Sequence, residues 1–297
     1  KIIKDRAEDF STSRTRYPFI IKLKTGVTQK GRIIAKQSEV IADNGAYNDK
    51  GPAVVNFAGV CFTTQYDVAN VKYDAYLVYT NKEYGTAFRG FGNTQIQFAF
   101  ESHLDDIAHS LGMDPMRIRL LNANRPGTKT ATGAVISSLG MVECIEAAAA
   151  AARWRKRSPN TTKEIPKVRG LGMSAVLHSG AGSRYYGYNS SSAFVKVSDE
   201  GKISLITPAS DMGQGAETVM AQIAAETIGA NVEDIIVFSG DTDLTSYELG
   251  AFGSRTTFVC GKAVKSAAEK VREEVLSLAS EMLDVPKDLL VPVSYTH

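Results

Sequence analysis

Three glycine-rich turns, each placed before a predicted helix, carry the groups of this chain best suited to bind a polar ligand. They span residues 88–92 (FRGFG), 212–215 (MGQG) and 252–256 (FGSRT). Such a turn leaves backbone N–H groups unpaired at the positive end of the helix dipole, which suits an anion. Any one turn could be a simple chain reversal, because glycine is the default residue of tight turns. Three together, each with a polar side chain, predict a large anionic ligand such as a dinucleotide or a pterin phosphate.

The known phosphate-binding fingerprints are missing from these turns. Gly90 and Gly92 begin the dinucleotide pattern G-x-G-x-x-G, but Gln95 stands where the last glycine belongs. Gly261 and Lys262 lack the serine or threonine that completes a P-loop motif. The sequence therefore excludes a Rossmann or P-loop type of site.

Histidine and carboxylate residues form no metal-binding pattern in the sequence. His103 and His109 lie six positions apart on a predicted helix, so they do not share one face. His178 has no partner nearby in the sequence. Asp241 and Asp243 could bind a cation, but the remaining ligand spacing of a calcium loop is missing. We therefore expect no side-chain metal ligand in this chain.

Alternating and β-branched runs predict strands, and apolar residues at helical spacing predict the helices that must position the turns. The expected strands span residues 17–24, 31–41, 71–79, 170–178, 192–197, 202–208 and 235–239. The expected helices span residues 93–111, 115–122, 143–157, 216–228 and 255–282. Residues 51–64 are predicted as an irregular connection. The charged residues 5–9 look like a strand end and are predicted as a solvated turn or as a segment whose arginine points into a site. This mixture favours an α+β fold with two domains of mixed sheets and packed helices.

Length and composition bound the class of protein. A chain of 297 residues suggests about two domains, and the polar, two-proline segment 158–169 predicts domains at 1–160 and 166–292. The net charge of +2 gives no electrostatic case for nucleic acid or a membrane surface, and no apolar run could span a bilayer. Three separated cysteines without a C-x-x-C pair favour reduced thiols in a cytoplasmic protein.

Both ends of the sequence favour an internal fragment of a longer protein. The chain starts at Lys1 without a methionine. Residues 293–297 (VSYTH) are typical of a translated sequencing adapter, so we expect them to be no part of the fold.

As a set, segments 86–92 (TAFRGFG), 212–215 (MGQG) and 250–255 (GAFGSR) resemble the cofactor loops of the molybdenum hydroxylase large subunits. This is the family of xanthine dehydrogenase, aldehyde oxidase and 4-hydroxybenzoyl-CoA reductase. The resemblance implies a molybdopterin-cofactor-binding fold, with the cofactor in bacteria usually in its cytosine dinucleotide form. It implies iron–sulfur and FAD subunits or domains as partners. It also implies an aromatic, heterocyclic or aldehyde substrate that is hydroxylated with water-derived oxygen or reductively dehydroxylated.

The same resemblance assigns roles to residues by position. The implied cofactor contacts are Phe88, Arg89, Gly90, Gly92, Met212, Gly213, Gln214, Gly215, Phe252, Gly253, Ser254, Arg255 and Thr256. The implied substrate contacts are Phe91, a ring that sandwiches an aromatic substrate, and Arg6, which orients it. The family's catalytic glutamate belongs to a portion outside this sequence. We therefore expect no catalytic residue here, and neither cofactor retention nor turnover by this polypeptide alone.

Individual residues help to separate branches of this family, and to separate an enzyme subunit from a carrier protein. Gly90 stands where the aerobic carbon monoxide dehydrogenase branch carries a reactive cysteine, which disfavours that branch. The alternative to an enzyme subunit is a non-catalytic carrier or assembly protein, which would need the same turns to bind a nucleotide or pterin but no substrate pocket. Phe91 and Arg6 separate the two, because both should face the cavity in an enzyme.

Overall fold

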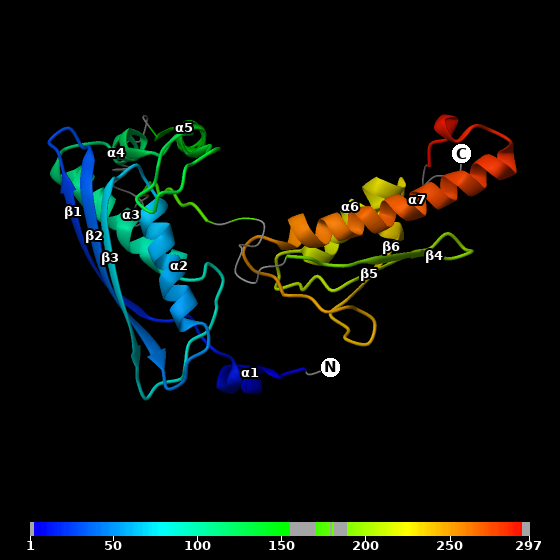
Figure 1. Cartoon of the computed structure of the whole chain (residues 1–297), viewed down its shortest axis with the longest axis horizontal. Helices are drawn as coiled ribbons and strands as arrows, with labels where there is room; N and C mark the ends of the chain where they lie inside the picture. The colour runs from blue at the N-terminus through cyan, green and yellow to red at the C-terminus, as the bar shows by residue number, and fades with distance from the viewer. Residues whose placement is uncertain (1–2, 155–169, 179, 181–188, 293–297) are drawn as a thin grey trace, which may run out of the picture. The chain divides into compact units, whose positions relative to one another are not determined.

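The computed structural model describes residues 3–154, 170–178, 180 and 189–292 (Figure 1). Contacts divide the chain into two compact units, the first over residues 4–178 and the second over residues 179–297 together with 1–3. The predicted boundary segment 158–169 and the predicted tail 293–297 lie outside the described residues. In the described ranges, no helix is long and apolar enough to cross a membrane.

A three-stranded mixed sheet is the frame of the first unit. Its strands, in spatial order, are β1 (Phe19–Val27), β2 (Ile33–Gly45) and β3 (Asn70–Tyr79). β1 and β2 are antiparallel, whereas β2 and β3 are parallel. A parallel pair needs a crossover connection, and helix α2 (Gly51–Thr64) supplies it (Figure 1). The three strands confirm the sequence prediction.

Helix α2 shows that the predicted irregular connection at residues 51–64 was wrong. Pro52 lies in its first turn, where the missing N–H costs no helical hydrogen bond. The helix packs on both β3 and α3 (Asn93–Ser110). Its buried residues are Gly51, Val54, Val55, Phe57, Ala58, Gly59, Cys61 and Phe62. A helix buried on several sides has too little polar surface to show an amphipathic period.

Helix α3 confirms the prediction for residues 93–111 and is the central helix of the first unit. Ile96, Phe100 and Leu104 are almost completely buried in the core that the helix shares with α2 and the sheet. Gly112 follows the helix with a φ of 61°, the left-handed conformation that favours glycine there.

Two shorter helices complete the first unit after α3. Helix α4 (Pro115–Asn122) is capped by Asp114, whose side chain accepts a hydrogen bond from the Met116 amide at 2.7 Å, as predicted. Helix α5 (Met141–Ala151) ends before the predicted residue 157, because Arg153 takes a left-handed φ of 52°. The Trp154 indole then donates to the Asp114 carboxylate at 3.0 Å.

The N-terminal segment forms a short helix, α1 (Arg6–Thr12), where the sequence predicted a turn at a strand end. Asp5 and Glu8 form a capping box that fixes its start. The Glu8 amide donates to the Asp5 carboxylate at 2.8 Å, and the Asp5 amide donates to the Glu8 carboxylate at 3.1 Å. This local pairing of charged residues explains the correction.

The segment 170–178 forms no strand, which corrects a third prediction. It is held against α3 instead, because the Glu101 carboxylate accepts from the Ala175 amide at 2.9 Å. The same carboxylate accepts from Arg119 Nε at 2.7 Å and from the Tyr66 hydroxyl at 2.6 Å. Arg119 and Glu101 are both almost completely buried. This network ties α3, α4, the end of α2 and the 170–178 segment into one body.

The second unit has its own three-stranded mixed sheet. Its strands, in spatial order, are β4 (Phe194–Val197), β5 (Ile203–Thr207) and β6 (Ile235–Ser239). Its helical elements are α6 (Ala216–Ile228), η3 (Val232–Asp234), the π-helical turn η4 (Thr256–Cys260), α7 (Gly261–Leu283) and η5 (Lys287–Leu289). β4 and β5 are antiparallel, and β5 and β6 are parallel. These strands, α6 and the long last helix confirm the prediction.

The two units follow the same order of elements along the chain. Each has an antiparallel strand pair, a crossover helix, a third strand parallel to the second, and a long helix. Residues 88–92 lie between β3 and α3, and residues 252–255 lie between β6 and η4, which begins at Thr256. Two of the three predicted turns therefore occupy equivalent positions in an α+β fold with mixed sheets.

Candidate cofactor site

The turn at residues 88–92 enters α3 through three consecutive residues with left-handed backbone. Gly90, Phe91 and Gly92 have φ angles of 99°, 51° and 86°. Phe91 is strained in this conformation, so its surroundings must hold it there. Gly92 is the N-cap of α3, and among the described residues no side-chain hydrogen bond caps that helix. The positive N-terminus of α3 is thus left for an anionic ligand.

Arg16 fixes this turn from a position 73 residues earlier in the chain. Its Nη2 donates to the Arg89 carbonyl oxygen at 2.7 Å, and its Nη1 donates to the Thr94 hydroxyl in the first turn of α3. The guanidinium also lies over the Phe88 ring, 4.7 Å from the ring centroid. Desolvation by burial lowers the pKa of Arg16. No sequence pattern points to Arg16, whereas Arg89 itself has an exposed side chain and contributes through its backbone.

A small aromatic cluster surrounds Phe91. Its half-buried ring meets Phe57 edge-on at 5.9 Å between centroids, and Phe57 meets the His178 ring at 5.1 Å. The Asn93 amide nitrogen donates to the Leu177 carbonyl at 2.8 Å and lies 3.1 Å from His178 Nδ1. Nδ1 must then accept, which leaves the proton of a neutral imidazole on Nε2. Burial lowers the pKa of His178, which favours that neutral form.

The second turn, residues 212–215, is closed by hydrogen bonds of its own side chains. The Met212 amide donates to Gln214 Oε1 at 2.5 Å, and Gln214 Nε2 donates to the Ser210 carbonyl at 3.0 Å. The Asp211 carboxylate accepts from the Gly213 amide at 2.6 Å, and this hydrogen bond is the main reason that the pKa of Asp211 is lowered. The turn therefore already holds one carboxylate with backbone N–H groups, as an anion site does.

The backbone of this second turn is open to a bulky ligand. Gly213 and Gly215 have φ angles of 92° and 80°, and within the described ranges no atom beyond the adjacent residues lies within 4 Å of a Cβ built on either one. Gly215 is also the N-cap of α6 and has no side chain to cap it, and the Asp211 carboxylate accepts from the Glu217 amide in the first turn at 3.4 Å. A flat ligand could therefore approach the main chain closely. These features fit a pterin with a phosphate group.

The third turn is built around a buried arginine. Gly253 and Ser254 both have left-handed backbone, with φ angles of 55° and 53°. Arg255 is fully buried, where its Nε donates to Asn189 Oδ1 at 2.9 Å and its Nη1 pairs with the Glu248 carboxylate. Its guanidinium is thus engaged within the second unit and shapes the turn. The backbone and the Ser254 hydroxyl are the groups that the turn can offer to a ligand.

The two residues expected to contact substrate lie in different environments. Phe91 is half-buried in the aromatic cluster described above. Arg6 lies on α1 with its side chain 82% exposed, and it pairs with Asp9 at 3.4 Å. Phe57 contacts Phe91 directly, and Phe57 in turn contacts His178, which lies beside Asn93. The sequence did not indicate these three residues as part of the site.

These turns and their frame define a class of protein, the molybdopterin cofactor-binding domains. Two family models described as molybdopterin cofactor-binding domain match residues 1–123 and residues 143–293. Together the two matches include all three glycine-rich turns.

The relatives identify the family more closely. The chain is 35% identical over 286 residues to the xanthine dehydrogenase molybdenum-binding subunit of Escherichia coli O157:H7, covering 95% of this chain and 38% of that subunit. It is 44% identical over 149 residues to the nicotinate dehydrogenase large molybdopterin subunit of Eubacterium barkeri, covering 50% of this chain and 35% of that one. Quinoline 2-oxidoreductase from Pseudomonas putida 86 matches in structure with a TM-score of 0.77 at 27% identity, covering 98% of this chain and 39% of that one.

The chain therefore belongs to the molybdenum hydroxylase large-subunit family, which confirms the resemblance found in its turns. It spans well under half the length of the relatives it matches.

Proposed function

We propose that this chain supplies two cofactor-binding units to the large subunit of a molybdenum-dependent oxidoreductase acting on an aromatic, heterocyclic or aldehyde substrate. One observation carries the proposal: turns 88–92 and 252–256 occupy equivalent positions and enter their helices through left-handed residues. When bound, the molybdenum cofactor supplies two-electron chemistry that moves a water-derived oxygen to or from the substrate. The residues of this chain bind and orient, and we assign none of them the role of catalytic base.

In this proposal the main chain makes most of the cofactor contacts. The backbone at Gly213 and Gly215 receives the pterin edge, because no side chain in the described ranges covers these two glycines. The backbone at Arg89, which Arg16 holds in place, would lie beside the metal centre of the bound cofactor. Ser254 adds a hydroxyl from the third turn.

Phe91 is the residue that we propose for contact with an aromatic substrate. Its ring is held by Phe57, and its left-handed backbone fixes its direction. We propose that this ring stacks on a flat substrate. Arg6 is so exposed that the structure gives its orienting role no support, and we assign that role to Phe91 alone.

The cofactor form and the partners follow from the family. We propose the cytosine dinucleotide form, and iron–sulfur and FAD subunits that carry electrons away from the site. The three free cysteines support a reducing compartment, the cytoplasm. Acid treatment of the purified complex should release cytidine monophosphate, and release of another nucleotide would contradict the cytosine form.

The test uses the complete large subunit that carries this sequence, with Gly213→Asn and a matched control, Gly201→Asn. Both glycines have positive φ, 92° and 78°, and open surroundings. Asparagine tolerates the left-handed region, so neither variant should lose the fold. Only Gly213→Asn places a side chain where the cofactor would lie.

We expect Gly213→Asn to lower the molybdenum content at least about tenfold, equivalent to 1.4 kcal/mol of binding, while Gly201→Asn keeps it. Both should unfold at the temperature of the parent. A Gly213→Asn subunit with full molybdenum content would refute the assignment of the second turn.

The alternative of a non-catalytic carrier is not favoured, because the named relatives are oxidoreductases. The parent complex should oxidise at least one of xanthine, nicotinate, quinoline or benzaldehyde with an artificial electron acceptor. A complex with full molybdenum content and no activity on such substrates would instead favour the carrier.

A further inference from the structure

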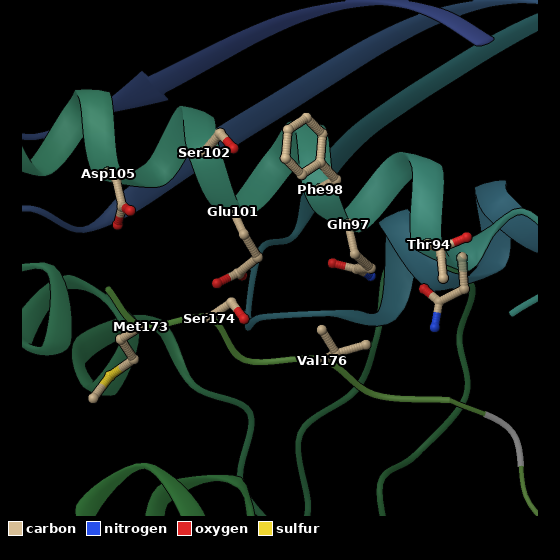
Figure 2. Close-up of a pocket in the computed structure, with 10 residues that line it drawn as sticks. Thr94, Gln97, Phe98, Glu101, Ser102, Asp105, Met173, Ser174 and Val176 are labelled. Carbon is tan, nitrogen blue, oxygen red and sulfur yellow. The ribbon is translucent and has the colours of Figure 1, made fainter. Parts of the chain in front are cut away.

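We propose that a cavity beside α3 in the first unit binds a small, neutral, flat ring compound with a lactam edge, in which an N–H donor and a C=O acceptor stand side by side. The cavity has a volume of about 340 Å³ and lies between α3 and the 173–176 segment (Figure 2). This volume falls within the range of small-molecule sites, roughly 300–1,000 Å³. The inference does not rest on the proposed function.

Gln97 is the residue that points to a ligand. It is only 3% exposed, yet its Nε2 and Oε1 atoms have no hydrogen-bond partner in the part of the chain that the structure describes. Figure 2 shows its side chain projecting from α3 toward Ser174 and Val176. Asn93, which also lines the cavity, has a buried Oδ1 atom in the same state. Buried polar atoms are rarely left unpaired, because their desolvation is costly.

The charges around the cavity select a neutral ligand. The Glu101 carboxylate is already used by donors from Gln65, Tyr66, Arg119 and Ala175. The other carboxylate of the lining, Asp105, pairs with Arg119 at 2.7 Å. The ten lining residues include no lysine or arginine that could attract an anion.

The geometry of a carboxamide selects the lactam edge. Gln97 presents one donor and one acceptor side by side, so a group that offers the same pair in reverse can satisfy both atoms at once. Val176 supplies an apolar wall for the face of a ring. One or two ordered waters could pair with Gln97, but they would not fill this volume or gain contacts from Val176. The Glu101 network holds α3 and the 170–178 segment together, which preforms the site.

The test uses the 297-residue chain labelled with ¹³C at the methionine methyl groups and titrated with 2-pyridone, a lactam. Met173 lines the cavity, whereas Met220 is fully buried in the core of the second unit and is the internal control. We expect a saturable shift of the Met173 signal, with no shift at Met220. N-methyl-2-pyridone lacks the N–H donor, so it should bind at least about tenfold more weakly, the effect of one lost hydrogen bond.

Two variants connect the shift to the proposed geometry. Gln97→Leu should abolish saturable binding, while the matched variant Gln37→Leu, at a half-buried glutamine of β2, should keep it. Ser102→Trp fills the cavity from an exposed position, so it should block binding of 2-pyridone without loss of the fold. If Gln97→Leu unfolds, this second variant still tests whether the ligand binds in the cavity.

Three outcomes would each overturn the inference. The first is a Met173 signal that does not saturate with 2-pyridone, and the second is binding that survives both Gln97→Leu and Ser102→Trp. The third is a crystal soaked in 2-pyridone in which the cavity holds only ordered water or another segment of polypeptide.

Discussion

Lys36 offers a test of the core of the first unit, which supports the turn at residues 88–92. It lies on β2, only 2% exposed, and its Nζ donates to the Gln65 carbonyl at 2.6 Å. The ammonium also lies over the rings of Phe62 and Phe100, at 4.7 and 4.8 Å from their centroids. Burial lowers the pKa of Lys36 from 10.5 to about 7, against a smaller opposing effect of Glu101.

The sign of the pH effect follows from this lowered pKa. Between about pH 7 and pH 10.5 the unfolded chain holds a proton on Lys36 that the folded chain has released. The contribution of neutral Lys36 to the stability of the fold is therefore fully present above the unfolded pKa, and it is lost as the pH falls toward 7. Each pKa unit corresponds to about 1.4 kcal/mol. Allowing for half-protonation at pH 7, the unfolding free energy should rise by about 2 kcal/mol from pH 7 to pH 9 through Lys36 alone.

Lys36→Met should remove this part of the pH dependence. Methionine has a similar length and suits a site between aromatic rings. The assay is urea unfolding of the 297-residue chain at pH 7 and pH 9, followed by fluorescence of Trp154, the single tryptophan, which lies in the same unit. The unfolding free energy of the variant minus that of the parent should be about 2 kcal/mol higher at pH 7 than at pH 9.

The control for this experiment is Lys24→Met, at an exposed lysine of β1 in the same sheet. In this control, the difference in unfolding free energy between pH 7 and pH 9 should be the same as in the parent. If Lys36→Met and its parent show the same difference, Lys36 is not a buried, largely neutral lysine, and the reasoning is refuted.

Three more predictions concern the supports of the site. Glu101→Gln deprives buried Arg119 of its main counter-charge, so urea unfolding should show a loss of about 3–5 kcal/mol; a loss below about 1 kcal/mol would contradict a buried pair. Arg16→Met should speed hydrogen exchange in turn 88–92 several-fold but leave the second unit unchanged. Because the pKa of Asp211 is lowered, the protection of the 212–215 amides from hydrogen exchange should weaken as the pH falls through that lowered value. In Asp211→Asn the same amides should be weakly protected already at pH 7.

Much of the architecture could be predicted from the sequence because its signals are local. The apolar spacing of α3, the Asp114 cap of α4 and the glycine that ends α6 all depend on residues within a few positions of each other. The three glycine-rich turns are local in the same sense, since left-handed backbone at a helix start requires glycine at most positions. Their order and spacing were enough to indicate the family.

The errors arose where packing decides between local alternatives. Helix α2 is covered by β3 and α3, so its apolar residues show no single face. Residues 170–178 have strand-like composition, but Glu101 takes the Ala175 amide that a strand ladder would use. Neither contact can be read from spacing, because the partners lie far apart in the sequence.

By itself, the sequence determined where glycine-rich turns precede helices, because glycine and helix-start signals act over a few residues. The tertiary structure alone decided what surrounds those turns. It brought Arg16 to the carbonyl of Arg89, placed Phe57 against Phe91, and buried Gln97 without a partner beside α3. Such contacts depend on how whole elements pack, and packing joins residues whose separation along the chain carries no signal.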